Sequence, residues 1–126
     1  MTPPGHTLFP AQRSALLEDA ARRAARYLDS LATRSVAPPA AAVARLDALD
    51  TSMPATSTDA AAVLARLDDL VGPATMAMAG PRFFGFVIGG ALPVTVAANW
   101  LATAWDQNAA LATATPGVSR VEAIAL

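Results

Sequence analysis

The sequence contains neither lysine nor cysteine, and each absence excludes some chemistry. Without cysteine the chain cannot form disulfides, bind a metal through thiolates or use a cysteine nucleophile. Without lysine no side chain can form a Schiff base with the carbonyl group of a cofactor. A genome rich in G and C explains a preference for alanine and arginine, but the chemical consequence is the same whatever its cause. The basic residues are all arginine: Arg13, Arg22, Arg23, Arg26, Arg34, Arg45, Arg66, Arg82 and Arg120.

Net charge is also nearly absent, at −1 near pH 7. We therefore expect no electrostatic attraction to nucleic acid or to anionic lipid. Residues 1–10 are rich in proline and form an irregular arm that lacks the charged start and apolar core of a signal peptide. We expect a cytoplasmic protein. The only histidine, His6, lies in this arm without a catalytic companion.

In residues 11–34 the apolar residues recur at spacings of three and four, which predicts an amphipathic helix. We expect the 126-residue chain as a whole to be mainly α. Glu18 precedes Arg22 by four residues and Asp19 precedes Arg23 by four, which is the favourable order for surface ion pairs. We interpret these arginines, with Arg26, as a solvated face rather than an anion site. The apolar stripe consists of Leu16, Ala20, Ala24, Tyr27 and Leu31.

Two further helices are predicted after a proline break at 35–40, which disfavours helix. The first is short, over 41–49. The second covers 59–71 after the loop 51–58, with Ser57 or Thr58 as its cap and Gly72–Pro73 as its end. The adjacent carboxylates Asp68 and Asp69 point in different directions on a helix and have no histidine nearby, so we expect solvated side chains rather than a metal site. Its expected buried stripe consists of Val63, Leu64, Leu67 and Leu70.

The stretch 83–105 carries no charge and leaves two interpretations open. Its length permits a membrane span, and residues 85–89 match the GxxxG helix-pairing pattern. Pro93, Asn99 and the pair Gly89–Gly90 favour instead an extended strand, a tight turn and a helix from about Pro93 to Gln107. We expect burial inside a protein assembly rather than in a membrane.

The helix predicted over 93–107 is apolar nearly all round, and such a helix is covered on several sides. The rest of the chain offers only thin, alanine-rich helices to cover it, so we infer that the covering partners lie outside these residues. A last helix starts after Thr115–Pro116 and runs to the end of the sequence without a capping signal. The sequence reads as cut within an element, and we expect it to fold poorly alone because of its exposed apolar surface.

An extended pattern in residues 80–126 resembles the pyridoxal-phosphate-dependent group II amino-acid decarboxylases, a family that includes glutamate, aromatic amino-acid and histidine decarboxylases. Its members commonly carry His-Pro-Arg-Phe-Phe, a short turn, a helix with Asn-Trp-Leu or a relative of it, and a Gln-Asn or Thr-Asn pair. The order of elements in 11–79 also follows the family. The matching residues are Gly80-Pro81-Arg82-Phe83-Phe84-Gly85-Phe86-Val87, Gly89-Gly90, Asn99-Trp100-Leu101, Trp105-Asp106-Gln107-Asn108, Pro116 and Glu122.

The resemblance implies the amino-terminal helical segment of a fold-type-I enzyme with an α/β parent fold, acting as a homodimer on an amino acid. Residues 11–79 would wrap the dimer, and residues 80–126 would begin the large cofactor-binding domain. Gly80 stands where the family has histidine. Ile88 and Gly89 stand where the glutamate and aromatic enzymes have polar residues. The resemblance therefore does not identify which amino acid is the substrate.

By resemblance, the loop after the two phenylalanines would border the substrate entrance, and Asn108 and Ala110 would approach the partner's pocket. Phe83 and Phe84 we expect in the core, and Phe86 fits the core or the entrance. Gly89 and Gly90 fit either a special backbone conformation or close approach to a ligand. The loop residues of the predicted substrate site are Phe86, Val87, Ile88, Gly89 and Gly90.

The cofactor implied is pyridoxal phosphate, which accepts the electrons left on the alpha carbon. The family's lysine, acidic partner and phosphate site lie downstream of the matched stretch, so we expect no catalytic, cofactor-binding or metal-binding residue here and no activity of these residues alone. A small membrane protein, an inactive remnant and a helical interaction module are the alternatives.

Overall fold

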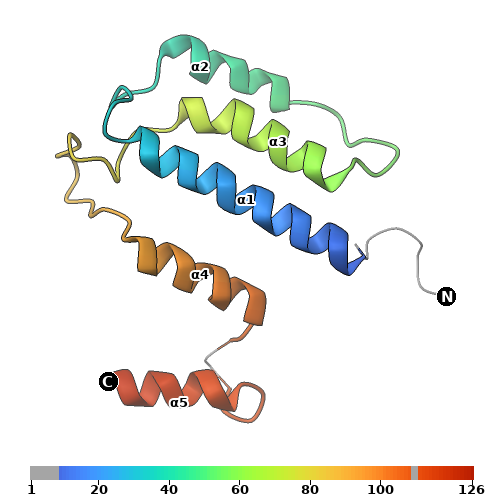
Figure 1. The fold of residues 1–126 in the computed structure, drawn as a ribbon, viewed down its shortest axis with the longest axis vertical. Helices are drawn as coiled ribbons and strands as arrows, with labels where there is room; N and C mark the ends of the chain where they lie inside the picture. The colour runs from blue at the N-terminus through green and yellow to red at the C-terminus, as the bar shows by residue number, and fades with distance from the viewer. Residues whose placement is uncertain (1–8, 109–110) are drawn as a thin grey trace. The chain divides into compact units, whose positions relative to one another are not determined.

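The computed structural model describes residues 9–108 and 111–126, and every regular element in this part of the chain is a helix (Figure 1). The expectation of a mainly α chain is confirmed, while the α/β parent fold stays a prediction. The chain divides into two compact units, Met1–Gly90 and Ala91–Leu126. The helices are α1 (Pro10–Ser30), α2 (Ala40–Ala44), the 3₁₀ helix η1 (Arg45–Leu49), α3 (Ala60–Val71), the 3₁₀ helix η2 (Gly72–Ala74), α4 (Pro93–Trp105) and α5 (Pro116–Ala125).

Helix α1 ends at Ser30, four residues before the end of the predicted helix 11–34. It begins with Pro10, where a missing N–H does no harm, and the backbone N–H of Phe9 donates to Gln12 Oε1 at 3.0 Å. It ends at Ser30, whose hydroxyl donates to the carbonyl of Tyr27 at 2.7 Å. Such local bonds compete with the helical ladder. Residues 31–34 therefore form turns instead of another helical turn.

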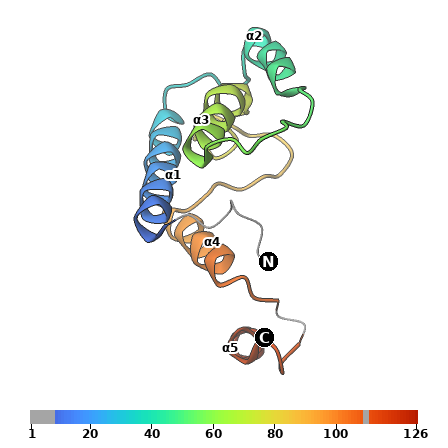
Figure 2. The ribbon, with the colours of Figure 1, turned by 90° about the vertical axis from the view of Figure 1, so that its right-hand side faces the viewer.

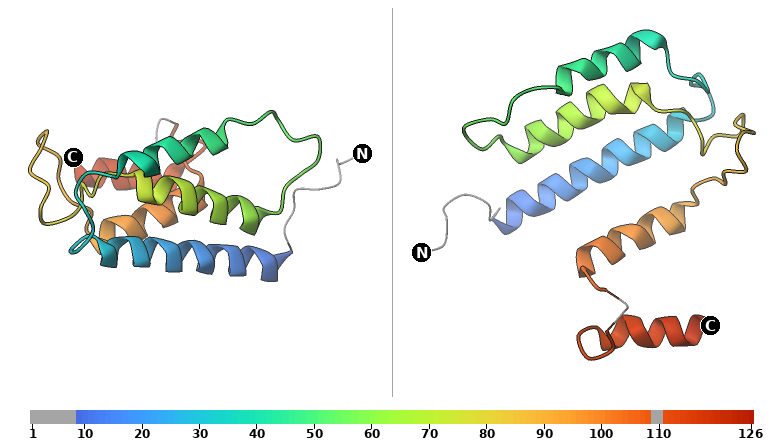
Figure 3. Two further views of the ribbon diagram at one scale, coloured as in Figure 1. Left: turned by 90° about the horizontal axis from the view of Figure 1, so that it is seen from above. Right: turned by 180° about the vertical axis from the view of Figure 1, so that it is seen from behind.

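In the first unit α1 and α3 run in the same direction, because α2 and η1 carry the chain back between them (Figures 1 and 3). The start of α1 faces the start of α3, where Leu16 and Ala60 line one cavity. Further along, Arg23 of α1 donates to Asp68 of α3 at 3.0 Å. The guanidinium of Arg66 donates to the carbonyl of Ala48 and so ties α3 to η1. Figure 2 shows α1 and α3 of this unit from the side.

The predicted stripe of α1 is confirmed, because every one of its members is at least half-buried and Leu31 is buried. The stripe of α3 is confirmed only in part: Leu64 and Leu70 are half-buried, but Val63 and Leu67 are more than half exposed. Among the described residues of this unit only Leu31 and Ala77 are buried apolar residues. The first unit therefore has a small apolar core, and polar contacts also connect its helices.

The cap of α3 was predicted at Ser57 or Thr58 and is instead Asp59, whose carboxylate accepts a hydrogen bond from the backbone N–H of Ala62 at 2.9 Å. An aspartate at this position satisfies an N–H that the first turn leaves unpaired, and its charge favours the positive end of the helix. The predicted end at Gly72 is confirmed.

Tyr27 and Arg34 connect the end of α1 to the segment after α3. The hydroxyls of Tyr27 and Thr75 share a hydrogen bond of 2.9 Å in which either can be the donor. The carbonyls of Met76, 3.3 Å from the Tyr27 hydroxyl, and of Gly72, 2.8 Å from the Thr75 hydroxyl, are the further acceptors of this pair. Arg34 donates to the carbonyls of Gly72 at 2.9 Å and Thr75 at 3.4 Å. Its guanidinium also lies 4.8 Å from the centre of the Tyr27 ring, a cation–π contact.

The second unit contains α4 and α5. The predicted helix starts at Pro93 and Pro116 are confirmed. The first of these helices ends at Trp105, two residues before the predicted end, because Asp106 adopts a left-handed conformation with φ 49°. Neither helix contains a buried residue, and the apolar Val94 and Trp105 are 70% and 58% exposed.

Only residues 93–105 of the uncharged stretch are helical. Within the part of the chain that the structure describes, no helix has both the length and the apolarity that a membrane crossing requires.

Candidate functional site

The segment that carries the family-like pattern leaves α3 and is held against the turn that follows α1. The backbone N–H of Ala77 donates to the carbonyl of Val36 at 3.0 Å, and the guanidinium of Arg82 donates to the carbonyl of Arg34. Gly80 lies close to Leu31, where an added Cβ would be 3.1 Å from the Leu31 carbonyl oxygen. These contacts fix residues 77–82 on the first unit.

Beyond Phe83 the chain presents its large apolar side chains to solvent. Phe83 is half-buried, and its ring lies against Gly85, where an added Cβ would be 3.2 Å from Phe83 Cζ. Phe84, expected in the core, is 92% exposed, so that expectation is wrong. Phe86 is 83% exposed and does not belong to the core either. The first unit has too little interior to enclose two more aromatic rings.

The predicted strand after Phe83 is wrong: the described residues contain no strand, and residues 83–92 form turns and irregular backbone. A strand needs a neighbour to accept and donate its backbone hydrogen bonds. The loop instead closes a turn through the N–H of Ile88, which donates to the carbonyl of Gly85 at 3.4 Å.

Within this turn the left-handed conformations fall on Phe86 (φ 59°) and Val87 (φ 55°). Such a conformation is unfavourable for any residue with a Cβ and most of all for a β-branched one. The neighbouring glycines do not take it: Gly89 has an ordinary φ and open space around it, and Gly90 has only a 3.8 Å contact to the Ala79 carbonyl. Neither glycine is therefore required by backbone conformation or by crowding within this chain.

The structure thus brings together five of the seven residues predicted for the substrate site, Phe86 to Gly90, as one exposed loop at the end of the first unit. Asn108 belongs to the second unit, where its carbonyl accepts a hydrogen bond from the hydroxyl of the buried Thr115. Ala110 lies outside the described residues.

The arginines of α1 are not only a solvated face. Both predicted ion pairs form, Glu18–Arg22 at 4.0 Å and Asp19–Arg23 at 2.8 Å. The hydrogen bond from Arg23 lowers the pKa of Asp19. The expectation that Asp68 is simply solvated is wrong, because it accepts a hydrogen bond from Arg23 at 3.0 Å.

Arg26 also approaches this carboxylate, with 3.7 Å between Arg26 Nη2 and Asp68 Oδ2. The neighbouring carboxylate is farther from its partner, with Asp69 Oδ1 3.9 Å from Arg23 Nη1. The adjacent aspartates therefore pair α3 with α1. No cluster in the described residues has the three histidine, cysteine or acidic groups that a metal site needs.

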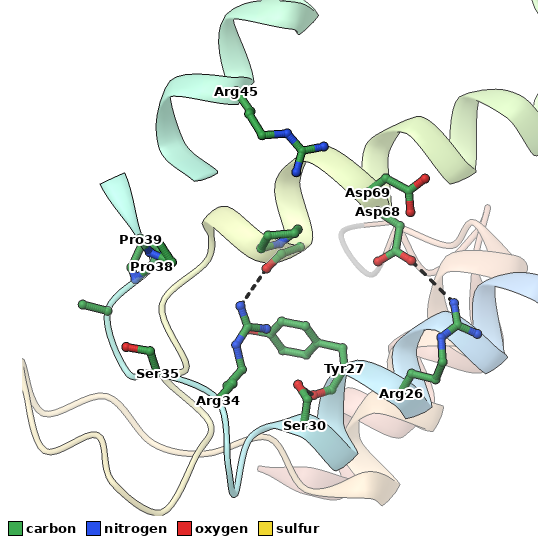
Figure 4. Close-up of a pocket in the computed structure, with 13 residues that line it drawn as sticks. Arg26, Tyr27, Ser30, Arg34, Ser35, Pro38, Pro39, Arg45, Asp68 and Asp69 are labelled. Atoms are coloured by element: carbon green, nitrogen blue, oxygen red, sulfur yellow. Dashed lines mark hydrogen bonds and ion pairs between the residues drawn. The ribbon is translucent and has the colours of Figure 1, made fainter. Parts of the chain in front are cut away.

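A cavity of about 780 Å³ lies elsewhere in the first unit, and none of the predicted site residues lines it (Figure 4). It opens between the end of α1, the proline break and the junction of α3 with η2. The sequence did not predict this cavity, and the only local hint of it is that Arg34 and Arg45 lie on either side of the proline pair. Its charged residues are Arg26, Arg34, Arg45, Asp68 and Asp69.

The residues present do not fit pyridoxal phosphate as holders of the cofactor. The sequence has no lysine to form the covalent bond. The loop predicted to border the substrate contributes only Phe86, Val87, Ile88 and two glycines, none of which bears an ionisable group. No step of a reaction through the cofactor can therefore be assigned to these residues.

Comparisons of the chain with models of known protein families, with curated proteins and with solved structures found no match.

Proposed function

We propose that residues 1–126 form the amino-terminal part of a pyridoxal-phosphate-dependent carboxy-lyase that decarboxylates an amino acid. In this proposal the enzyme is a cytoplasmic homodimer, and its cofactor lysine lies outside these residues. The role of this part is to contribute dimer interface and the entrance to the substrate site. It contains no catalytic residue.

The observation that carries the proposal is the extended residue pattern that runs from Gly80 to Glu122. Pro-Arg-Phe-Phe alone would be a weak signal. Together with a short turn at 89–90, Asn99-Trp100-Leu101 and Gln107-Asn108 it forms a more specific one, because the family that this segment resembles commonly carries corresponding groups in the same order.

The distribution of apolar surface supports the proposal. The side chains of Phe84, Phe86 and Val87 are 92%, 83% and 105% exposed in one short loop. Large contiguous apolar patches on a protein are usually sites of interaction. In the assembled enzyme this loop would line the entrance and exclude water from the substrate, while α4 and α5 would be covered by the rest of the large domain.

The left-handed backbone at Phe86 and Val87 supports the same assignment. Unfavourable backbone conformations concentrate at functional sites, where surrounding structure holds them. We infer that the loop is held in this conformation by protein that packs on its exposed apolar side chains.

Purification of the native polypeptide with an antibody raised against α1 tests the proposal. We expect an enzyme that releases CO₂ from one of a panel of carbon-labelled amino acids and loses this activity when its pyridoxal phosphate is removed. A native polypeptide that contains pyridoxal phosphate but only transfers amino groups would contradict the carboxy-lyase assignment. A polypeptide without the cofactor would contradict the family assignment and favour a remnant or an interaction module.

Within the active enzyme, substitution of Ile88 by Ser tests the substrate entrance. Because the side chain would touch the substrate rather than the cofactor, we expect a change in KM of about tenfold, equivalent to about 1.4 kcal/mol, with little effect on cofactor content. The matched control is Val63→Ser on the exposed face of α3, which should leave KM unchanged.

A further inference from the structure

We propose that the cavity at the end of α1 binds a small organic anion, a carboxylate or a phosphate monoester with an apolar body, through Arg45 and Arg34. This site shares no residue with the substrate entrance proposed above. The two proposals therefore stand or fall separately.

The carboxylates at this cavity already have cationic partners. Asp68 accepts a hydrogen bond from Arg23 at 3.0 Å and lies 3.7 Å from Arg26. Asp69 lies 3.9 Å from the Arg23 guanidinium. The cavity is therefore not arranged to bind a cation.

Arg34 has no carboxylate partner in the described residues. Its two hydrogen bonds, to the carbonyls of Gly72 and Thr75, both come from Nη2. Nη1 and Nε of Arg34 make no hydrogen bond with the residues that the structure describes. Because these bonds and the Tyr27 ring fix the guanidinium, it is preorganised to bind an anion at little entropic cost.

Arg45 is the second such arginine. Its side chain is exposed and makes no hydrogen bond or ion pair with any residue that the structure describes. Figure 4 shows that Arg45 extends toward the cavity from η1, whereas Arg34 extends into it from the turn after α1. Both arginines line the same cavity from two different elements, and guanidinium groups bind carboxylate and phosphate oxygens through paired N–H groups.

The remaining walls indicate the kind of anion. The ring of Tyr27 and the side chains of Pro38, Pro39 and Pro73 are apolar or aromatic, and the hydroxyl of Ser35 adds a further donor at the rim. The cavity of about 780 Å³ is open to solvent and has room for a group larger than inorganic phosphate. These features favour an anionic group attached to an aromatic or aliphatic body.

The chain provides its own reporter for this cavity, because Tyr27 is the only tyrosine in the sequence. Incorporation of 3-fluorotyrosine gives a single ¹⁹F resonance at the cavity wall. We expect this resonance to shift saturably when phenyl phosphate or benzoate is added to the full chain at millimolar concentration. The uncharged analogue benzamide should leave it in place.

Arg45→Gln is the test variant, since Arg45 has no partner whose loss would unfold the chain. We expect its apparent Kd for phenyl phosphate to rise about tenfold, which corresponds to the loss of one charged donor pair. The matched control is Arg13→Gln, which makes the same charge change on α1 away from the cavity and should shift the Kd less than about twofold. Circular dichroism of both variants checks that the helices are intact.

Each outcome decides the proposal. Binding of either anion that depends on Arg45 supports it, and the stronger of the two identifies the carboxylate or the phosphate as the preferred group. No saturable shift, an equal response to benzamide, or equal weakening by Arg13→Gln and Arg45→Gln would overturn it.

Discussion

Gly80 packs against the backbone of Leu31 so closely that a Cβ atom at position 80 would lie 3.1 Å from the Leu31 carbonyl oxygen and 3.1 Å from that of Ala77. Both neighbours are backbone atoms and cannot rotate away. At the position where the resembling family has histidine, a side chain in this chain would therefore crowd the backbone of two neighbours. The contact between Gly80 and Leu31 joins the family-like segment to the buried end of α1.

This contact predicts that Gly80→Ala destabilises the first unit, by about 1–2 kcal/mol, through overpacking against backbone. Gly89→Ala is the matched control, because nothing lies within 4 Å of the added methyl group and its φ is ordinary. The control should be neutral or slightly stabilising. Thermal unfolding of the dilute chain, followed by circular dichroism, measures both. Equal stabilities of the two variants would show that Gly80 is not tightly packed.

The left-handed turn predicts a substitution that stabilises. Val87→Gly removes an unfavourable conformation and loses no packing, because Val87 is 105% exposed. The expected gain is small, about 1 kcal/mol or less, since glycine also has more freedom to lose on folding. Ile88→Gly, next to it and without a left-handed φ, should destabilise the loop. Hydrogen exchange of the amides of residues 85–90 reports on the loop directly, and a loss of protection in Val87→Gly would contradict the prediction.

Acid should weaken the ion pair between Asp19 and Arg23 within α1. The pKa of Asp19 is lowered in the folded chain from its ordinary value of 3.8, mainly by the hydrogen bond from Arg23. A lowered folded-state pKa contributes stability that is present above pH 3.8 and is lost as the pH falls through the folded-state value. We therefore expect the midpoint of urea unfolding to fall below pH 4, by an amount that Asp19→Asn reduces.

The control for this titration is Asp29→Asn, at an exposed carboxyl of the same helix for which the described residues supply no ion pair. It should leave the dependence on pH as it is in the unmodified chain. A loss of stability that is the same in all three proteins would assign the acid effect to other carboxyl groups.

Removal of the Tyr27 hydroxyl should cost about 1 kcal/mol, the usual net contribution of one buried or half-buried hydrogen bond. Tyr27→Phe loses the 2.9 Å bond to Thr75 Oγ1 and the longer 3.3 Å bond to the Met76 carbonyl, and keeps the ring that Arg34 covers. A double-mutant cycle with Thr75→Val isolates the coupling between the two hydroxyls. A coupling energy of zero would mean that the bond does not stabilise the first unit.

Most of the helices could be predicted because helix starts and apolar spacing depend on residues close together in the sequence. Pro93 and Pro116 start helices because a fixed φ and a missing N–H suit the first turn, and spacing alone identified the buried stripe of α1. The cap of α3 was one residue off, since Ser57, Thr58 and Asp59 are all good caps and only the geometry selects among them.

What the sequence did not predict depends on contacts between distant residues. The pairing of Asp68 with Arg23 requires knowing that α1 and α3 run side by side. Predicting the cavity that Arg34 and Arg45 line requires knowing the path of the chain through the proline break. The predicted strand after Phe83 failed because strand formation needs a partner, and apolar composition alone does not supply one.

The most direct test of the proposed function is to locate the cofactor in the native polypeptide. Reduction with borohydride followed by peptide mass spectrometry identifies the residue that carries pyridoxal phosphate. We predict a single modified lysine, on the same polypeptide as residues 1–126 and outside them. Recovery of the native polypeptide with no cofactor-modified lysine would contradict the assignment of this chain to a pyridoxal-phosphate-dependent enzyme.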